Sequence, residues 1–142
     1  MNSKIKHGYD ALLALRSIDD RATAVTADGP GGLVVDLHRL TAGRGDLKNL
    51  YGQTPFDVVI VVDAATDATL KVQTVDAAGA NPVDAPGGSV TAVAGKTFVL
   101  KFDPATLAAA DADAAGIRVF ADVEPTTGTV SYYAFAAPNS KA

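Results

Sequence analysis

The most pronounced apolar pattern in the chain is the run Phe-Asp-Val-Val-Ile-Val-Val at residues 56–62. This run is too short for a globular helix, is rich in β-branched residues and is bounded by Pro55 and Asp63, as a strand buried on both faces would be. After turn residues at 64–68, residues 69–74 alternate between apolar and polar side chains, which is typical of a half-exposed strand. We therefore expect a hairpin whose first strand lies in the middle of a sheet.

Six further segments have the short length, the alternation and the flanking turn residues of β-strands. They lie at residues 21–27, 33–37, 89–93, 97–102, 117–123 and 129–136. We expect the first two to pair across the glycine-rich turn at 28–32, and the next two to form a hairpin around Ala94 and Gly95.

The order of these segments predicts the fold class. About eight strands follow one another at short intervals without alternating helices, which favours antiparallel sheets packed face to face. We predict an all-β, antiparallel jelly-roll sandwich. An immunoglobulin-like Greek key is the alternative, and it is disfavoured because the chain contains neither Trp nor Cys.

Three stretches fall outside the strand pattern. In residues 1–20, Leu12, Leu13 and Leu15 have roughly helical spacing, so we expect a short helix or an extended arm over about residues 9–17. The leucines of this arm either close one open end of the sandwich or contact a partner. The predicted organisation is therefore an arm at 1–20, a sandwich at 21–137 and a tail at 138–142.

The two other stretches connect strands. Residues 38–55 form a connection long enough to suggest a functional or contact-making loop. Residues 104–115 are rich in alanine but weakly amphipathic, so we expect a single helical turn in a surface loop.

The amino-acid composition and the net charge argue against several classes of function. The content is 48% hydrophobic but only 6% aromatic, which favours a thin two-layer core, and the absence of Cys excludes disulfides and thiolate metal sites. A net charge of −4 argues against a general nucleic-acid binder. No run approaches the ~18 apolar residues of a membrane span, and the first residues lack the pattern of a signal peptide. We expect a soluble protein that is made in a cytoplasm and binds no membrane.

Residues suited to acid–base catalysis are few. The histidines are His7 and His38, and the only glutamate is Glu124. Asp36 and His38 would share one face of a strand, but no activated Ser or Thr is identifiable beside them, so we interpret the pair as a surface hydrogen bond. We predict no catalytic residues and no enzymatic activity.

Metal and phosphate motifs are also incomplete. Asp111 and Asp113 resemble the opening of an EF-hand loop, but Ala115 and Gly116 break the ligand pattern. The glycines at 29–32 lie between strands, with no helix N-terminus to hold an anion. We predict no metal and no cofactor.

Two short motifs are typical of recognition surfaces. Arg44-Gly45-Asp46 spells a receptor-binding tripeptide, which we interpret instead as a turn that uses the conformational freedom of glycine. Tyr133 and Phe135 would form a sugar-stacking platform if both faced outward, although alternation on this strand places one set of side chains in the core.

The pattern as a whole, over residues 18–137, resembles the jelly-roll cement or decoration proteins on the capsids of tailed bacteriophages. The resemblance lies in a leader followed by Ile-Asp-Asp-Arg-Ala-Thr-Ala-Val-Thr-Ala (18–27), Val-Val-Asp-Leu (34–37), a glycine-bearing loop, the long apolar strand, Thr-Leu-Lys-Val-Gln-Thr (69–74), Ala-Gly-Lys-Thr-Phe-Val-Leu (94–100) and Gly-Thr-Val-Ser-Tyr-Tyr-Ala-Phe-Ala (128–136).

This resemblance implies a structural protein of the virion, made in the host cytoplasm, that binds the outside of the capsid. It would be a homo-oligomer, dimer or trimer, that stabilises the shell by bridging adjacent capsomers of the major capsid protein. The alternative is a carbohydrate- or receptor-binding β-sandwich of an adhesin or fibre. We expect partner contacts from apolar residues of the arm and from basic or aromatic residues of the 38–55 loop, namely Ile5, Tyr9, Leu12, Leu13, Arg39, Arg44, Lys48 and Tyr51.

Overall fold

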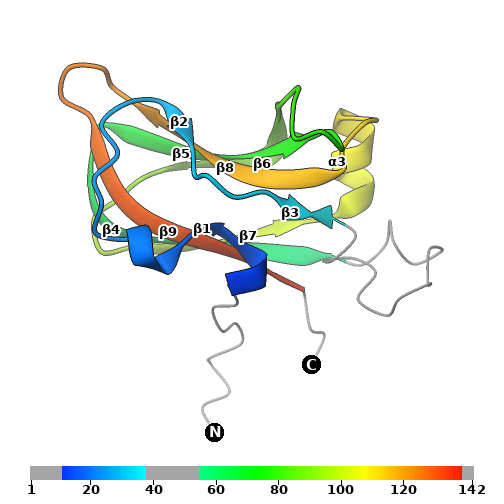
Figure 1. Cartoon of the computed structure of the whole chain (residues 1–142), viewed down its shortest axis with the longest axis horizontal. Helices are drawn as coiled ribbons and strands as arrows, with labels where there is room; N and C mark the ends of the chain where they lie inside the picture. Colours follow the sequence, from blue (N-terminus) through cyan, green and yellow to red (C-terminus); the bar gives the residue numbers. More distant parts are fainter. Residues whose placement is uncertain (1–10, 38–54, 139–142) are drawn as a thin grey trace, which may run out of the picture.

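The computed structural model describes residues 11–37 and 55–138, which form two antiparallel β-sheets packed face to face (Figure 1). Three short helices accompany the strands: η1 (Ala11–Leu13), η2 (Ile18–Asp20) and α3 (Pro104–Ala110). The strands are β1 (Ala14–Arg16), β2 (Gly29–Pro30), β3 (Val35–Asp36), β4 (Phe56–Thr66), β5 (Ala68–Val75), β6 (Val83–Thr91), β7 (Thr97–Phe102), β8 (Gly116–Val123) and β9 (Thr129–Pro138).

The order of strands is that of a jelly roll. Sheet A has the order β1-β9-β4-β7, and sheet B has the order β2-β8-β5-β6. β2 pairs with Phe120 and Ala121 of β8, and β3 pairs with Gly116 and Ile117 of the same strand, so β2 and β3 act as one interrupted edge strand. Counted with β2 and β3 as one strand, each layer has four strands, and every connection except that between β5 and β6 passes from one sheet to the other, as in a double Greek key. The predicted all-β jelly-roll sandwich is confirmed.

The predicted pairing of β4 with β5 is wrong. These strands lie in different sheets, since β4 pairs with β7 and β9 while β5 pairs with β6 and β8. Between them Asp67, with a φ of 47°, turns the chain from sheet A into sheet B. Alternation of side chains shows which face of a strand is buried, but it does not show which strand is its neighbour. A corner between two sheets therefore has the same sequence pattern as a hairpin within one sheet.

Two other predicted pairings are also wrong. Residues 89–93 and 97–102 do not form a hairpin, because β6 belongs to sheet B and β7 to sheet A. Residues 21–27 and 33–37 do not pair across the glycine-rich turn, because Val25 bridges to Val130 of sheet A and Val35 pairs with β8 of sheet B. The hairpin that the structure does contain joins β5 to β6 through residues 76–82, a pairing that was not predicted.

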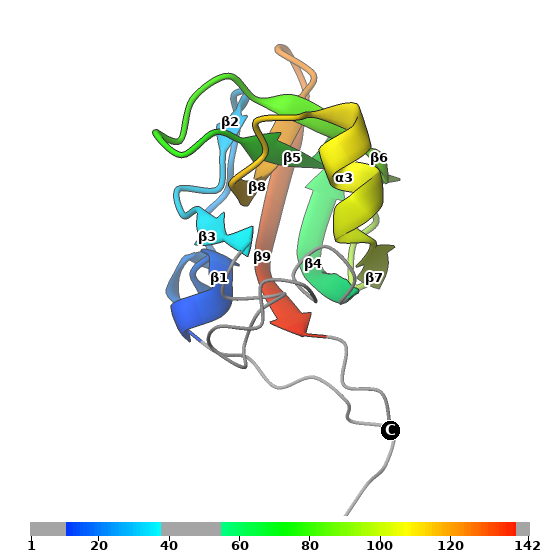
Figure 2. The ribbon, with the colours of Figure 1, turned by 90° about the vertical axis from the view of Figure 1, so that its right-hand side faces the viewer.

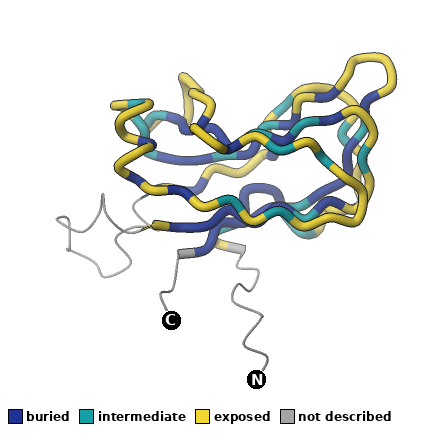
Figure 3. The backbone as a smooth tube through the Cα atoms, turned by 180° about the vertical axis from the view of Figure 1, so that it is seen from behind, coloured by how far each residue is buried: buried dark blue, intermediate teal, exposed yellow. Residues whose placement is uncertain are grey.

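The hydrophobic core lies between the two sheets, and Figure 3 shows the buried stretches running along the strands while the connecting loops are exposed. Phe56, Val58 and Ile60 of β4 are completely buried, as are Leu70 of β5 and Val119 of β8. Burial of a side chain of this size stabilises the fold by roughly 1.5–3 kcal/mol.

Helix α3 closes the core beside β6 (Figure 2). Asp103 caps its N-terminus by accepting a hydrogen bond from the backbone N–H of Ala105, and Pro104 occupies the first turn, where its missing N–H costs nothing. Leu107 is 1% exposed and enters the core. The helix spans seven residues, so it is longer than the predicted single turn.

The N-terminal segment is part of the sandwich rather than a separate arm. Ala14–Arg16 form β1, which pairs with β9 of sheet A, and Leu15 is completely buried in the core. Arg16 donates from Nε to the backbone oxygen of Tyr132 at 3.0 Å. Of the two alternatives expected over residues 9–17, a short helix or an extended arm, the described part shows η1 followed by the extended β1, so helical structure ends at Leu13 and β1 joins sheet A. Pairing with β9 buries Leu15, which outweighs the weak helical spacing of the leucines.

Candidate binding surfaces

The outer face of sheet B carries a connected set of polar side chains. Lys71 lies 3.9 Å from the carboxylate of Asp84 and 3.5 Å from that of Asp122. Gln73 donates to Asp84 at 2.9 Å and accepts from Arg118 Nε at 3.0 Å. These residues satisfy one another across three neighbouring strands, which makes this face well suited to contact with water.

The outer face of sheet A combines buried apolar side chains with polar ones, since Asp57 and Lys101 lie opposite each other on it. Ala14, Val59, Phe135 and Ala137 are 4–7% exposed, yet they lie outside the cluster of side chains between the sheets. Alternation explains their position, because Val58 and Ile60 point into the core and Val59 therefore points to the other side of the sheet. Sheet A thus has buried apolar side chains on both faces, as the run at 56–62 indicated.

The segment from η1 to Arg21 lies along β9, with β1 as the edge strand of sheet A. Both η1 and η2 contact β9. Arg21 donates from Nε and Nη2 to the two carboxylate oxygens of Asp63 at 2.8 and 2.7 Å, and its guanidinium lies 5.0 Å from the centre of the Tyr133 ring. The hydrogen bond from Arg21, aided by its positive charge, lowers the pKa of Asp63. Arg21 therefore connects the N-terminal segment to two strands of sheet A.

The aromatic pair on β9 faces outward but is not open to a ligand. Tyr133 and Phe135 stack with ring centres 6.3 Å apart, and the strand alternation places both on the outer face of sheet A. However, Phe135 is only 4% exposed, and Arg21 lies over Tyr133. A sugar-stacking platform needs accessible ring faces, so the geometry of this pair does not favour the carbohydrate-binding alternative.

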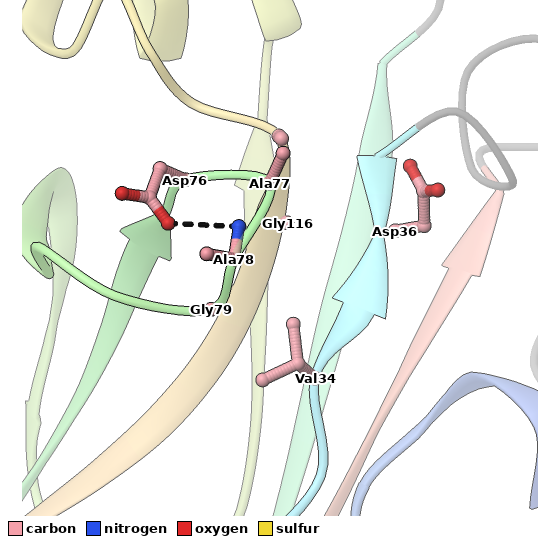
Figure 4. A pocket seen from close by; sticks show the side chains of 8 residues that line it. Val34, Asp36, Asp76, Ala77, Ala78, Gly79 and Gly116 are labelled. Carbon is pink, nitrogen blue, oxygen red and sulfur yellow. Dashed lines mark hydrogen bonds between the residues drawn. The ribbon is translucent and has the colours of Figure 1, made fainter.

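An open cleft of about 450 Å³ lies between β3 and the β5–β6 turn (Figure 4). Small side chains and Val34 line it, with Asp36 and Asp76 on opposite sides. The Asp76 carboxylate accepts hydrogen bonds from the backbone N–H groups of Ala80 (2.9 Å) and Ala78 (3.0 Å) and from the side-chain amide of Asn81 (2.8 Å). These bonds, that of Ala80 foremost, lower the pKa of Asp76. The carboxylate therefore orders the turn that forms one wall of the cleft.

Other acidic residues also organise turns. Asp111 accepts from the Thr74 hydroxyl at 2.8 Å and from the backbone N–H of Asp113 at 3.1 Å. Glu124 accepts from the backbone N–H groups of Thr126 and Thr127 in the corner between β8 and β9, and these bonds together with that from the Thr127 hydroxyl lower its pKa. Within residues 11–37 and 55–138, no three His, Asp or Glu side chains gather in a way that could hold a metal ion.

Two of the predicted contact residues are in the described structure, and both belong to η1. Leu12 is 72% exposed, whereas Leu13 is half-buried and packs against the core cluster. Leu13 and Leu15 thus close the sandwich, which was one of the two roles expected for these leucines. The remaining predicted contacts and both histidines lie outside the described residues, namely Ile5, His7, Tyr9, His38, Arg39, Arg44, Lys48 and Tyr51.

Tyr132 carries a polar atom that the core does not satisfy. Its side chain is completely buried, and its hydroxyl has no hydrogen-bond partner in the described part of the chain. Burial raises the pKa of Tyr132 to about 12, although the nearby Arg16 guanidinium opposes the shift. The hydroxyl is therefore retained in the core at a cost, since an unsatisfied buried group of this kind typically costs about 1–3 kcal/mol.

We predict a loss of stability between pH 10 and 12 that depends on Tyr132. A tyrosine ionises near pH 10 in the unfolded chain but only near pH 12 in the fold, so its contribution is complete below pH 10 and disappears as pH rises. The expected loss is on the order of 2 kcal/mol. Urea unfolding at successive pH values measures it.

The matched variants are Tyr132→Phe and Tyr133→Phe, the latter at a half-buried position. Tyr132→Phe should reduce the alkaline loss and should leave stability unchanged or higher at pH 7, because it removes an unsatisfied hydroxyl. A clear destabilisation at pH 7 would show that the hydroxyl has a partner after all.

Comparisons with known proteins give no assignment: no family model, no curated protein and no solved structure matches this chain. Within the described residues no helix has the length and apolar character needed to cross a membrane.

Proposed function

We propose that this protein is a structural component of a bacteriophage virion that binds the outside of the capsid and stabilises it by bridging adjacent capsomers. In this role it acts by binding and performs no reaction. The partner is the major capsid protein, and several copies assemble on the shell. The resemblance of residues 18–137 to capsid cement and decoration proteins supports this proposal, as does the jelly-roll order of the strands.

The observation that carries the proposal is a difference between the two sheets. Sheet B presents side chains that pair with one another, including Lys71, Asp84 and Asp122, whereas sheet A has an exposed apolar side chain at each edge, Leu12 just before β1 and Val99 on β7. Exposed apolar area favours association and paired polar groups favour contact with solvent, so this asymmetry suits a protein that attaches to a larger surface by one side.

The N-terminal segment carries the more exposed of the two apolar side chains, Leu12 and Val99. Leu12 is 72% exposed there, while neighbouring Leu15 fixes the segment in the core. Binding to the assembled shell, and not to free subunits, would stabilise the shell by mass action. Repeated copies would add avidity without any catalytic chemistry.

The test mixes the purified protein with shells assembled from the major capsid protein of the same genome. We expect the protein to sediment with the shells and to raise the temperature at which they open. Leu12→Ser should weaken binding about tenfold, as expected when a leucine at an interface loses most of its buried apolar area. Val93→Ser is the matched control, because Val93 is a 47% exposed valine in the β6–β7 loop.

Absence of the wild-type protein from the shell fraction would contradict the proposed function. Equal binding by Leu12→Ser and Val93→Ser would remove η1 from the interface. Deletions should stop at residue 10, since removal of β1 would take Leu15 out of the core and confuse loss of binding with loss of folding.

A further inference from the structure

The four edges of the two sheets are not equivalent. β1 has three residues and an irregular register, and the β2–β3 edge consists of two-residue pieces that include Pro30. β6 carries four residues, 85–88, opposite a single residue of β5, and this bulge contains Pro86. α3 also contacts β6. Short strands, bulges, prolines and covering elements all hinder the addition of another strand to an edge.

The fourth edge, β7, has none of these features within residues 11–37 and 55–138. Its six residues pair with β4 in unbroken register from Phe56–Phe102 to Val61–Thr97, and it contains no proline. Val99 is 50% exposed, and Phe98 and Leu100 are half-buried. We call the exposed side of this strand the β7 edge, defined by Lys96, Thr97, Val99 and Lys101.

The register shows which backbone groups the β7 edge presents. Val62 donates its backbone N–H to the carbonyl of Lys96 at 3.0 Å. In an antiparallel pair the residues bonded to the neighbouring strand alternate with those directed away from it. Phe98 and Leu100 therefore bond to β4, and the N–H and C=O groups of Thr97, Val99 and Lys101 point away from it. These groups form a regular row to which an extended chain can bond.

The lysines of the β7 edge also differ from the other cationic side chains of the described residues. Six Lys and Arg side chains lie in the described residues, and four of them form hydrogen bonds or ion pairs: Arg16, Arg21, Lys71 and Arg118. The other two are Lys96 and Lys101, for which the described structure shows no salt bridge, although Asp57 of β4 lies opposite Lys101 in the strand register. Lys96 lies over the Phe98 ring at 5.9 Å. Both unpaired cations thus flank the regular edge.

We propose that the β7 edge binds an extended, acidic segment of a partner polypeptide, which adds a fifth strand to sheet A. Backbone bonds to Thr97, Val99 and Lys101 supply the pairing. An acidic side chain of the segment lies beside Lys101 on the outer face of sheet A, and another lies beside Lys96 where the edge begins. On the face of Phe98 and Leu100, the segment packs apolar side chains beside these two residues. Identification of the partner as a capsid protein rests on the proposed function, but the binding mode does not.

The test uses two eight-residue peptides in which valine alternates with either glutamate or lysine, added to the full-length protein. We expect the acidic peptide to bind about fivefold more tightly, because its outward glutamates attract Lys101 whereas the lysines of the other peptide repel it. Binding should shift the backbone amide resonances of residues 96–101 in NMR spectra and slow their hydrogen exchange. The double variant Lys96→Glu/Lys101→Glu should reverse the preference between the peptides.

Val99→Pro provides a second, independent variant. Proline removes a donor that points away from β4, so the edge loses a bond to an added strand while the ladder to β4 remains. Weakened binding of the acidic peptide with an unchanged circular dichroism spectrum is the expected result. If Val99→Pro does not fold, the charge-reversal variant still decides the question.

Three results would overturn the inference. They are equal affinity for the two peptides, chemical-shift changes that lie away from residues 96–101, and a concentration-dependent dimer of the wild type that Val99→Pro converts to monomer. The last would show that a second copy occupies the edge. Shell binding that survives in Val99→Pro would leave the proposed function intact while removing the β7 edge from it.

Discussion

Replacement of Leu15 by alanine is expected to destabilise the protein by about 3 kcal/mol, within the range of roughly 2–5 kcal/mol measured for buried leucines in other proteins. Leu15 is completely buried although it lies only a few residues from the start of the described structure. The variant loses apolar area and leaves a cavity that the short β1 strand cannot refill. The midpoint of thermal unfolding should fall by roughly 10 °C.

Leu12→Ala is the control for this prediction. Leu12 lies three residues away in the same segment and is 72% exposed, so its replacement should change stability by less than about 0.5 kcal/mol. Equal effects of the two substitutions would mean that the N-terminal segment does not dock through β1 in solution.

Replacement of Gly128 by alanine is expected to destabilise the protein by about 3 kcal/mol, at the upper end of the usual cost of overpacking. An added Cβ would overlap the backbone nitrogen of Glu124 and would lie 2.5 Å from Val123 Cγ1 and 2.6 Å from the Glu124 oxygen. Backbone atoms cannot move aside as a flexible side chain can. The tight corner between β8 and β9 would have to open.

Gly29→Ala is the matched control, because an added Cβ at Gly29 meets no atom within 4 Å and the backbone conformation there is ordinary. It should be neutral or stabilising by up to about 1 kcal/mol through the reduced entropy of the unfolded chain. Denaturant unfolding of both variants measures the difference. A similar cost for the two would contradict the close packing of the corner.

These features also connect stability with the proposed binding roles. Leu15 and the bidentate bond from Arg21 to Asp63 hold the N-terminal segment against sheet A, so Leu12 has a defined position at the surface. The β7 edge lies at the far side of the same sheet. Sheet A therefore carries both proposed contacts, and sheet B is left facing solvent.

Part of this arrangement was predictable from residue patterns. The segment at 97–102 matches β7, and those at 117–123 and 129–136 match β8 and β9 to within two residues. The apolar run at 56–62 also indicated a strand buried on both faces, and Val59 and Phe56 are indeed both buried. These features were predictable because alternate residues of a strand face the core, so the apolar pattern lies within the strand's own sequence.

The candidate surfaces were less predictable. The sequence indicated contacts from the arm and from the 38–55 loop, of which only Leu12 and Leu13 lie in the described structure, and Leu13 packs on the core. The β7 edge had no distinctive signal, because Thr97, Val99 and Lys101 alternate with apolar residues as in any half-buried strand. Its role as an edge depends on which strands come to lie beside it.

By itself, the sequence determined the two-layer, all-β architecture and the approximate limits of β5, β7, β8 and β9, because these follow from local alternation and turn residues. The tertiary structure alone decided that Asp67 is a corner, that Leu15 belongs to a strand and that β7 ends a sheet. Pairing between strands depends on side chains that are distant in sequence and meet only in the assembled core, so no local pattern contains that information.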